Sequence, residues 1–144
     1  MPAEAEFQYT ILRVVPSIAR GERINAGVVV FCQRHDFLRA RVDVHIGRLA
    51  ALTPHLDPAD IRAHLEGLRS VADGDPSAGV LATLTPSQRF GWLTSPSSTV
   101  IQPSAVHTGL TADPEATLRR LFETLVGPDA QELSFRDLPP PPRS

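Results

Sequence analysis

The sequence contains no lysine and only one cysteine, one tryptophan and one tyrosine. All 14 basic residues are arginines. Without lysine there is no P-loop lysine, no lysine Schiff base and no lysine–glutamate pair of a kinase site, so the chain is not itself a standard NTPase, pyridoxal-phosphate enzyme or protein kinase. The lone Cys32 excludes an internal disulfide, which is typical of proteins from a reducing compartment.

Long apolar runs are also missing. No run approaches the length of a membrane span, and the N-terminus shows no charged-then-apolar leader. We therefore expect a cytoplasmic protein that does not engage a membrane. The net charge of −2 gives no strong attraction to nucleic acid, so we do not expect nucleic acid as a partner.

The length and composition suit one globular domain, because 144 residues that are 42% apolar can bury a sizeable core. We expect this domain to span residues 1–129. Residues 130–144 include a run of four prolines, 139–142, and are expected to form a poorly ordered tail.

Apolar, β-branched segments predict the strands of an antiparallel sheet. Residues 7–15 and 24–32 are apolar on both faces, and residues 37–44 alternate apolar and charged side chains. A fourth, shorter strand is expected at residues 99–102. Residues 18–22 are expected to form a polar turn.

Two segments carry strong helix-start signals, Asp57-Pro58 and Asp113-Pro114. Apolar residues at helical spacing follow each of them, to about residues 72 and 126. The spacing of Thr85 and Gln88 fits a capping box, which predicts a short helix over residues 86–93. Residues 45–52 suggest a helical turn, and residues 77–84 fit either a strand or a short helix. The expected fold class is α+β: an antiparallel sheet of three to four strands with two long amphipathic helices packed on one face.

Residues 89–109, which lie between the two long helices, form the stretch around which we expect the functional surface. They hold the only tryptophan, a histidine and many serine and threonine residues. Phe90 and Trp92 are interpreted mainly as core anchors of the short helix. A Trp92 that faces a partner is the alternative, since exposed tryptophans are common interface hot spots.

Four segments together resemble a bacterial family catalogued as domain of unknown function 3037: YTILRVVP (9–16), RGERINAGVVVF (20–31), RFGWLTSPSSTVIQPSAVHTG (89–109) and DPEATLRRLFETL (113–125). The likeness runs from about residue 7 to residue 126. Family members are small, intracellular and uncharacterised, and some are encoded beside a HipA-like kinase. The resemblance implies an accessory or regulatory role with a partner protein and names no activity. Ser97 departs from the arginine that is common at this position in the family, which weakens any anion contact there.

His107 is the residue most open to a catalytic role, because histidine titrates near neutral pH. Ser104 lies three residues before it, but no glycine elbow flanks the serine and no acidic third member is fixed by spacing. A His107 that hydrogen-bonds within its own loop is the more ordinary interpretation. The histidines lack ligand spacing, so neither a metal nor a cofactor is expected. Cys32 ends an apolar strand and is interpreted as a buried small hydrophobe.

A second group of residues suits an anion. Arg20, Arg23 and Arg89 could converge on a phosphate or carboxylate, because guanidinium groups bind oxyanions bidentately. Three polar residues would complete that site: Asn25, Gln102 and His107. The alternative is that Glu22 pairs with one arginine and that the others are solvated.

Two functions remain open from the sequence. The first is a non-enzymatic accessory module that binds a partner protein, with a HipA-like kinase as one candidate. The second is a small enzyme or ligand-binding protein that acts on a phosphate-bearing molecule through the arginine cluster and His107. The sequence leaves undecided whether the protein is an enzyme.

Overall fold

The structure is a computed structural model that describes residues 3–17, 22–52, 55–96 and 100–127. These residues form five strands, four α-helices and two 3-10 helices. In chain order the elements are β1 (Ala5–Ser17), β2 (Glu22–Cys32), η1 (Gln33–His35), β3 (Phe37–Val42), α1 (Ile46–Leu52), α2 (Pro58–Asp73), η2 (Pro76–Thr83), α3 (Pro86–Leu93), β4 (Ile101–Pro103), β5 (His107–Thr111) and α4 (Pro114–Leu125).

The sheet is antiparallel and is organised around the long strand β1. Its order is β3-β2-β1-β4, and β5 pairs with β1 as well. β4 and β5 share one side of β1: β4 lies along Leu12–Val14 and β5 along Ala5–Tyr9. In the segment between β4 and β5, the strand that pairs with this side of β1 therefore changes from β4 to β5.

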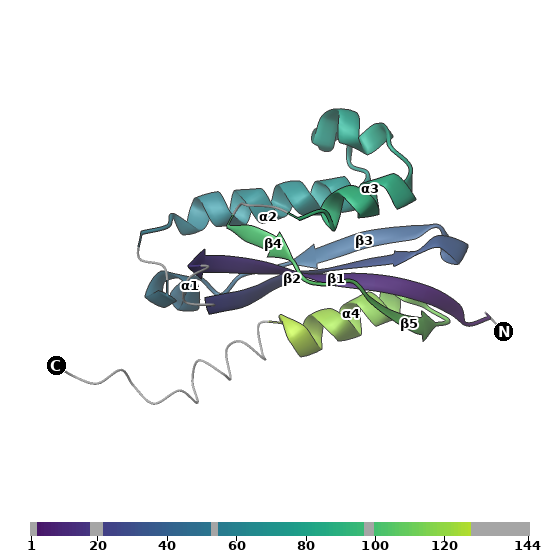
Figure 1. Cartoon of the computed structure of the whole chain (residues 1–144), viewed down its shortest axis with the longest axis horizontal. Helices are drawn as coiled ribbons and strands as arrows, with labels where there is room; N and C mark the ends of the chain where they lie inside the picture. The colour runs from purple at the N-terminus through teal and green to yellow at the C-terminus, as the bar shows by residue number, and fades with distance from the viewer. Residues whose placement is uncertain (1–2, 18–21, 53–54, 97–99, 128–144) are drawn as a thin grey trace.

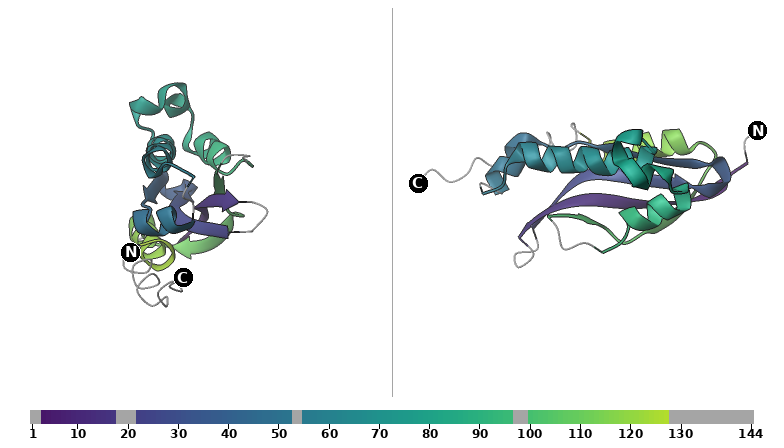
Figure 2. Two further views of the ribbon diagram at one scale, coloured as in Figure 1. Left: turned by 90° about the vertical axis from the view of Figure 1, so that its left-hand side faces the viewer. Right: turned by 90° about the horizontal axis from the view of Figure 1, so that it is seen from above.

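Both faces of the sheet are covered, because the apolar run of β2 points side chains to each face in turn. Val29 and Phe31 belong to a core cluster that includes residues of α2 and α3. Val28 and Val30 belong to a second cluster that includes residues of α4. Figure 1 shows the sheet edge-on, with α2 and α3 above it and α4 below it. The end-on and top views of Figure 2 agree with this layering.

This layering corrects one prediction. The α+β class, the antiparallel sheet and the two long helices are observed, but the helices lie on opposite faces and not on one. The reason lies in β2, where five consecutive residues, Val28–Cys32, are all buried, so a helix on one face alone would leave half of them uncovered.

The local helix signals are confirmed. Asp57 caps α2 by accepting a hydrogen bond from the Ala59 N–H at 2.9 Å. Thr85 and Gln88 form the capping box of α3. Asp113 caps α4 through the Ala116 N–H at 3.2 Å. Each cap joins residues two or three apart, so these helix starts depend only on the local sequence.

Several strand and loop predictions change. The sheet has one strand more than expected, because residues 107–111 form β5 and not a loop. β5 exposes three of its five residues and contains a glycine, so it shows little of the alternation by which strands are recognised. Residues 77–84 fall mostly in η2, which is kinked at Gly79. Most of the turn expected at residues 18–22, and the whole tail 130–144, lie outside the described residues.

Gly109 illustrates how closely β5 packs on β1. A Cβ atom built on Gly109 would lie 2.7 Å from Cε1 of the buried Phe7 ring. We predict that Gly109→Ala lowers the free energy of unfolding by about 1–3 kcal/mol, because the ring must move within a packed core. Gly67→Ala is the matched control, since no atom lies within 4 Å of its Cβ and the site is an exposed helix interior. That change should instead stabilise the protein by about 0.5–1 kcal/mol. Urea denaturation of both variants tests the pair, and equal stability of the two would contradict the packing described.

Candidate functional site

A cavity of 280 Å³ lies between α2, α3 and β4. We call it the Trp92 cavity. Its lining comes mostly from residues 89–109, with Leu12, His64 and Leu68 completing it, and the members from the stretch are Trp92, Leu93, Ser95, Pro96, Ile101 and Pro103. The stretch singled out in the sequence thus forms most of the wall of an apolar cavity.

Trp92 lies at the edge of this cavity because of how α3 sits on the sheet. Phe90 and Leu93 turn toward the core and are 6% and 4% exposed. Phe90 packs on Phe31, with ring centroids 5.2 Å apart. Trp92 lies on another side of the same short helix and is 45% exposed. The expectation that both aromatic residues anchor α3 holds for Phe90 and is wrong for Trp92.

A second hollow of 560 Å³ follows α2 toward its N-terminus. His64 lines both hollows, so they lie along the same side of α2, and we call them together the α2–β4 groove. Leu68 marks one end, and Asp57 with Asp60 marks the other. At 1.5 Å per helical residue, the groove extends roughly 16 Å along α2. It is apolar at the Trp92 end, and at the opposite end it carries two acidic residues, Asp57 and Asp60, beside His55.

Two polar groups of the groove are engaged by the backbone. The Ser95 hydroxyl donates to the Gly91 carbonyl at 2.8 Å, and the Asp57 carboxylate caps α2. Across the described residues, no cluster of three or more histidine, cysteine or acidic side chains has a geometry that could hold a metal ion.

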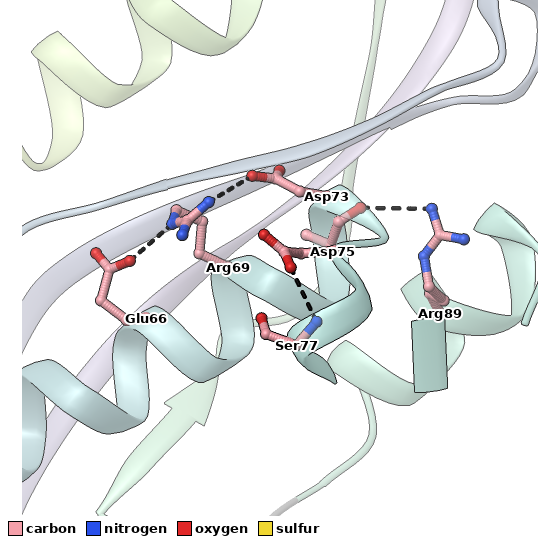
Figure 3. A network of polar contacts seen from close by, with 7 residues as sticks. Glu66, Arg69, Asp73, Asp75, Ser77 and Arg89 are labelled. Atoms are coloured by element: carbon pink, nitrogen blue, oxygen red, sulfur yellow. Dashed lines mark hydrogen bonds and ion pairs between the residues drawn. The ribbon is translucent and has the colours of Figure 1, made fainter. Parts of the chain in front are cut away.

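Arg89 makes structural contacts. It is 9% exposed, and its guanidinium lies against the C-terminal end of α2 (Figure 3). Nη1 donates to the Leu84 carbonyl at 2.7 Å and Nη2 donates to the Ala72 carbonyl at 3.5 Å. The cation thus joins α2, the end of η2 and α3, and it satisfies carbonyls that a helix end leaves open.

The other members of the expected anion site are not brought to Arg89. The Asn25 amide donates to the Leu125 carbonyl at 3.0 Å, so it lies on the α4 face while Arg89 lies on the α2 face. Arg23 is exposed at the start of β2, and Gln102 is half-buried in β4, opposite Arg13. Arg20 lies outside the described residues. Arg89 is therefore not part of the expected convergence, whereas Asn25 and Gln102 both lie opposite Arg13, on the two strands that flank β1.

His107 and Ser104 do not form a nucleophilic pair. His107 is exposed at the start of β5, and its ring lies 5.1 Å from the ring of Tyr9. The Ser104 hydroxyl is engaged by the backbone: it accepts from the Ile11 N–H and donates to the Ala105 carbonyl, both at 2.9 Å. Ser104 therefore joins β1 to the segment between β4 and β5, where a regular ladder is interrupted.

Ion pairs beside Arg89 hold the C-terminal half of α2 (Figure 3). Arg69 donates to Glu66 at 2.8 Å and to Asp73 at 2.7 Å. The hydrogen bond to Glu66 is the main cause that raises the pKa of Arg69. The Ser77 N–H, which donates to Asp75, lowers the pKa of that carboxyl. These contacts stabilise the junction between α2 and η2, and none of the residues that make them lines the α2–β4 groove.

The family comparison covers most of this structure. A family model described as "Protein of unknown function (DUF3037)" matches residues 9–126. The chain belongs to the DUF3037 family. The resemblance seen in the sequence is thereby confirmed, and the match includes every element that lines the α2–β4 groove. Neither the curated proteins nor the solved structures contain a match to this DUF3037 protein. Within the described residues, no helix combines the length and the apolar character needed to cross a membrane.

About half of the residues that line this groove were predicted from the sequence. Residues 89–109 were singled out, but the contribution of α2, especially His64 and Leu68, was missed. These two residues are four positions apart and so share one side of the helix. That spacing was the available signal, but it does not tell which side of a helix borders a cavity.

Proposed function

We propose that this DUF3037 protein is a non-enzymatic accessory module that binds a partner protein through the α2–β4 groove. The observation that carries the proposal is the half-exposed Trp92 beside a 280 Å³ apolar cavity. An exposed tryptophan next to unfilled apolar surface is the usual composition of an interface hot spot. An apolar side chain of a partner would fill the cavity and cover the indole ring.

The charge of the groove defines the chemistry of the partner further. Asp57 and Asp60 stand at the end away from Trp92 and attract a basic side chain. An extended chain advances about 3.3 Å per residue, so a groove of roughly 16 Å accommodates about five residues. The partner is therefore an extended segment with an apolar anchor and an arginine or lysine about five residues away. The HipA-like kinase implied by the resemblance is one candidate.

The alternative function, action on a phosphate-bearing molecule, has less support. Arg89 is buried and bonded to carbonyls, and the acidic end of the groove repels a phosphate. The accessory role is preferred for this reason.

Co-purification of the tagged protein at native expression level, followed by calorimetry with the purified companion, tests this function. We expect Trp92→Ala to weaken the companion's affinity by at least tenfold, since hot-spot truncation costs about 2 kcal/mol or more. Asp60→Lys should also weaken it by reversing the charge at the acidic end. Val80→Ala is the control, because Val80 is 81% exposed and does not line the groove. The proposal would be refuted if no companion protein co-purified, or if the companion bound the Trp92→Ala variant with unchanged affinity.

A further inference from the structure

β5 presents an outer edge with hydrogen-bonding groups that point away from the sheet. Ile11 directs both its N–H and its C=O toward Ser104, at 2.9 and 2.8 Å. Because these directions alternate along a strand, Tyr9 and Phe7 face the same side of β1. Their partners His107 and Gly109 therefore turn their backbone groups toward β1. Thr108 and Leu110, which alternate with them, direct their N–H and C=O groups out of the sheet.

This edge lacks the protection that exposed strands usually carry. Charged residues or prolines normally guard an edge against pairing with another chain. At the opposite edge of the sheet, β3 exposes Arg39 and Arg41. Residues 104–112 contain no acidic residue, no arginine and no proline. They instead expose Val106 and Leu110, at 40% and 66%.

We propose that β5 pairs with β5 of a second copy of this chain, antiparallel about a two-fold axis at Thr108. In this register Thr108 faces Thr108 of the partner subunit, and the outward backbone groups of both strands bond to each other. Val106 then lies opposite Leu110 of the partner subunit, and Leu110 opposite Val106 of the partner subunit. The two sheets become continuous across the interface.

The side chains of β5 favour a second copy over an unrelated strand. A two-fold interface must be complementary to itself, so that residue i meets residue j and j meets i. The two exposed apolar residues, Val106 and Leu110, lie two positions either side of Thr108 and so satisfy this condition. On the other face, His107 lies opposite Gly109 of the partner subunit, which has no side chain to obstruct the ring. Cross-strand pairs of this kind stabilise a sheet.

The interface is small, so the dimer is weak. One strand pair lies at the low end of the sizes seen for specific interfaces, and it is expected to associate only at high protein concentration. The proposal is independent of the α2–β4 groove, because none of residues 106–110 lines it.

Disulfide trapping in the full chain tests the register. Thr108→Cys places two thiols on facing residues about 5.5 Å apart at Cα, within the range that a disulfide spans. Leu110→Cys alone is the matched control, since the two equivalent Cα atoms would lie roughly 14 Å apart along the strands. The double variant Val106→Cys/Leu110→Cys restores facing pairs. The native Cys32 is buried and does not interfere.

We expect mild oxidation to give covalent dimers of the Thr108→Cys and double variants at least tenfold faster than of Leu110→Cys. Sedimentation equilibrium of the unmodified protein at high concentration should show reversible association. Thr108→Pro removes an outward N–H without touching the β1 ladder, so it should abolish the association while the circular dichroism spectrum stays native. Equal cross-linking of Thr108→Cys and Leu110→Cys, or a monomer at every concentration, would overturn the proposal.

Discussion

Leu65→Ala and Leu118→Ala each lower the free energy of unfolding by about 2–5 kcal/mol, the range for deleting a buried leucine side chain. Both residues are 1% exposed. Leu65 belongs to the cluster under α2, and Leu118 belongs to the cluster under α4. Each substitution therefore leaves a cavity between a helix and the face of the sheet that it covers. Urea denaturation monitored by circular dichroism measures both losses.

The double variant tests whether the two helices cover opposite faces. Residues in separate clusters contribute independently, so the two losses should add to within about 0.5 kcal/mol. A coupling well above that would mean that Leu65 and Leu118 share one core. Val80→Ala is the control for an apolar side chain that is 81% exposed, and we expect it to change the stability by less than about 0.5 kcal/mol.

Arg89→Met lowers the free energy of unfolding by about 2–4 kcal/mol, since it leaves the part-buried Leu84 carbonyl and the buried Ala72 carbonyl without their donor. Methionine preserves most of the side-chain volume, so the loss measures the hydrogen bonds and the cation at the end of α2 more than packing. Arg23→Met is the matched control, because Arg23 is exposed. We expect the free energy of unfolding of this variant to change by less than about 0.5 kcal/mol.

The Arg89 result also bears on function. A structural arginine is stabilising without any ligand, so the loss should appear in the purified protein alone and should not depend on added phosphate. If Arg89→Met were as stable as the unmodified protein but lost a phosphate-dependent stabilisation, Arg89 would be a ligand-binding residue. The accessory role proposed above would then give way to the phosphate-binding alternative.

The surface proposed for a partner and the edge proposed for a second copy lie on different parts of the fold. The groove follows α2 and β4, and the self-pairing edge is β5. A dimer through β5 would leave both grooves available, so one dimer could hold two partner segments. The avidity of such a dimer for a partner with two binding segments would exceed the affinity of one groove.

The features that could be predicted from the sequence were local. The starts of α2, α3 and α4 were predicted to the residue, because a capping side chain acts on N–H groups two or three positions away. The strands β1 and β2 were predicted because each contains a long run of apolar, β-branched residues. The family itself was recognised from four short segments.

Tertiary structure alone decided how these elements meet. β5 forms because residues 107–111 pair with β1, which lies about a hundred positions earlier in the chain, and no local pattern encodes that pairing. The same holds for Arg89, whose burial depends on the arrival of α2, and for Trp92, whose exposure depends on the side of α3 that Phe90 and Leu93 anchor to the sheet. Long-range packing sets which face of an element is covered, so residues 89–109 could be marked as important from the sequence, while their division into a buried arginine, an exposed tryptophan and an open strand edge could not.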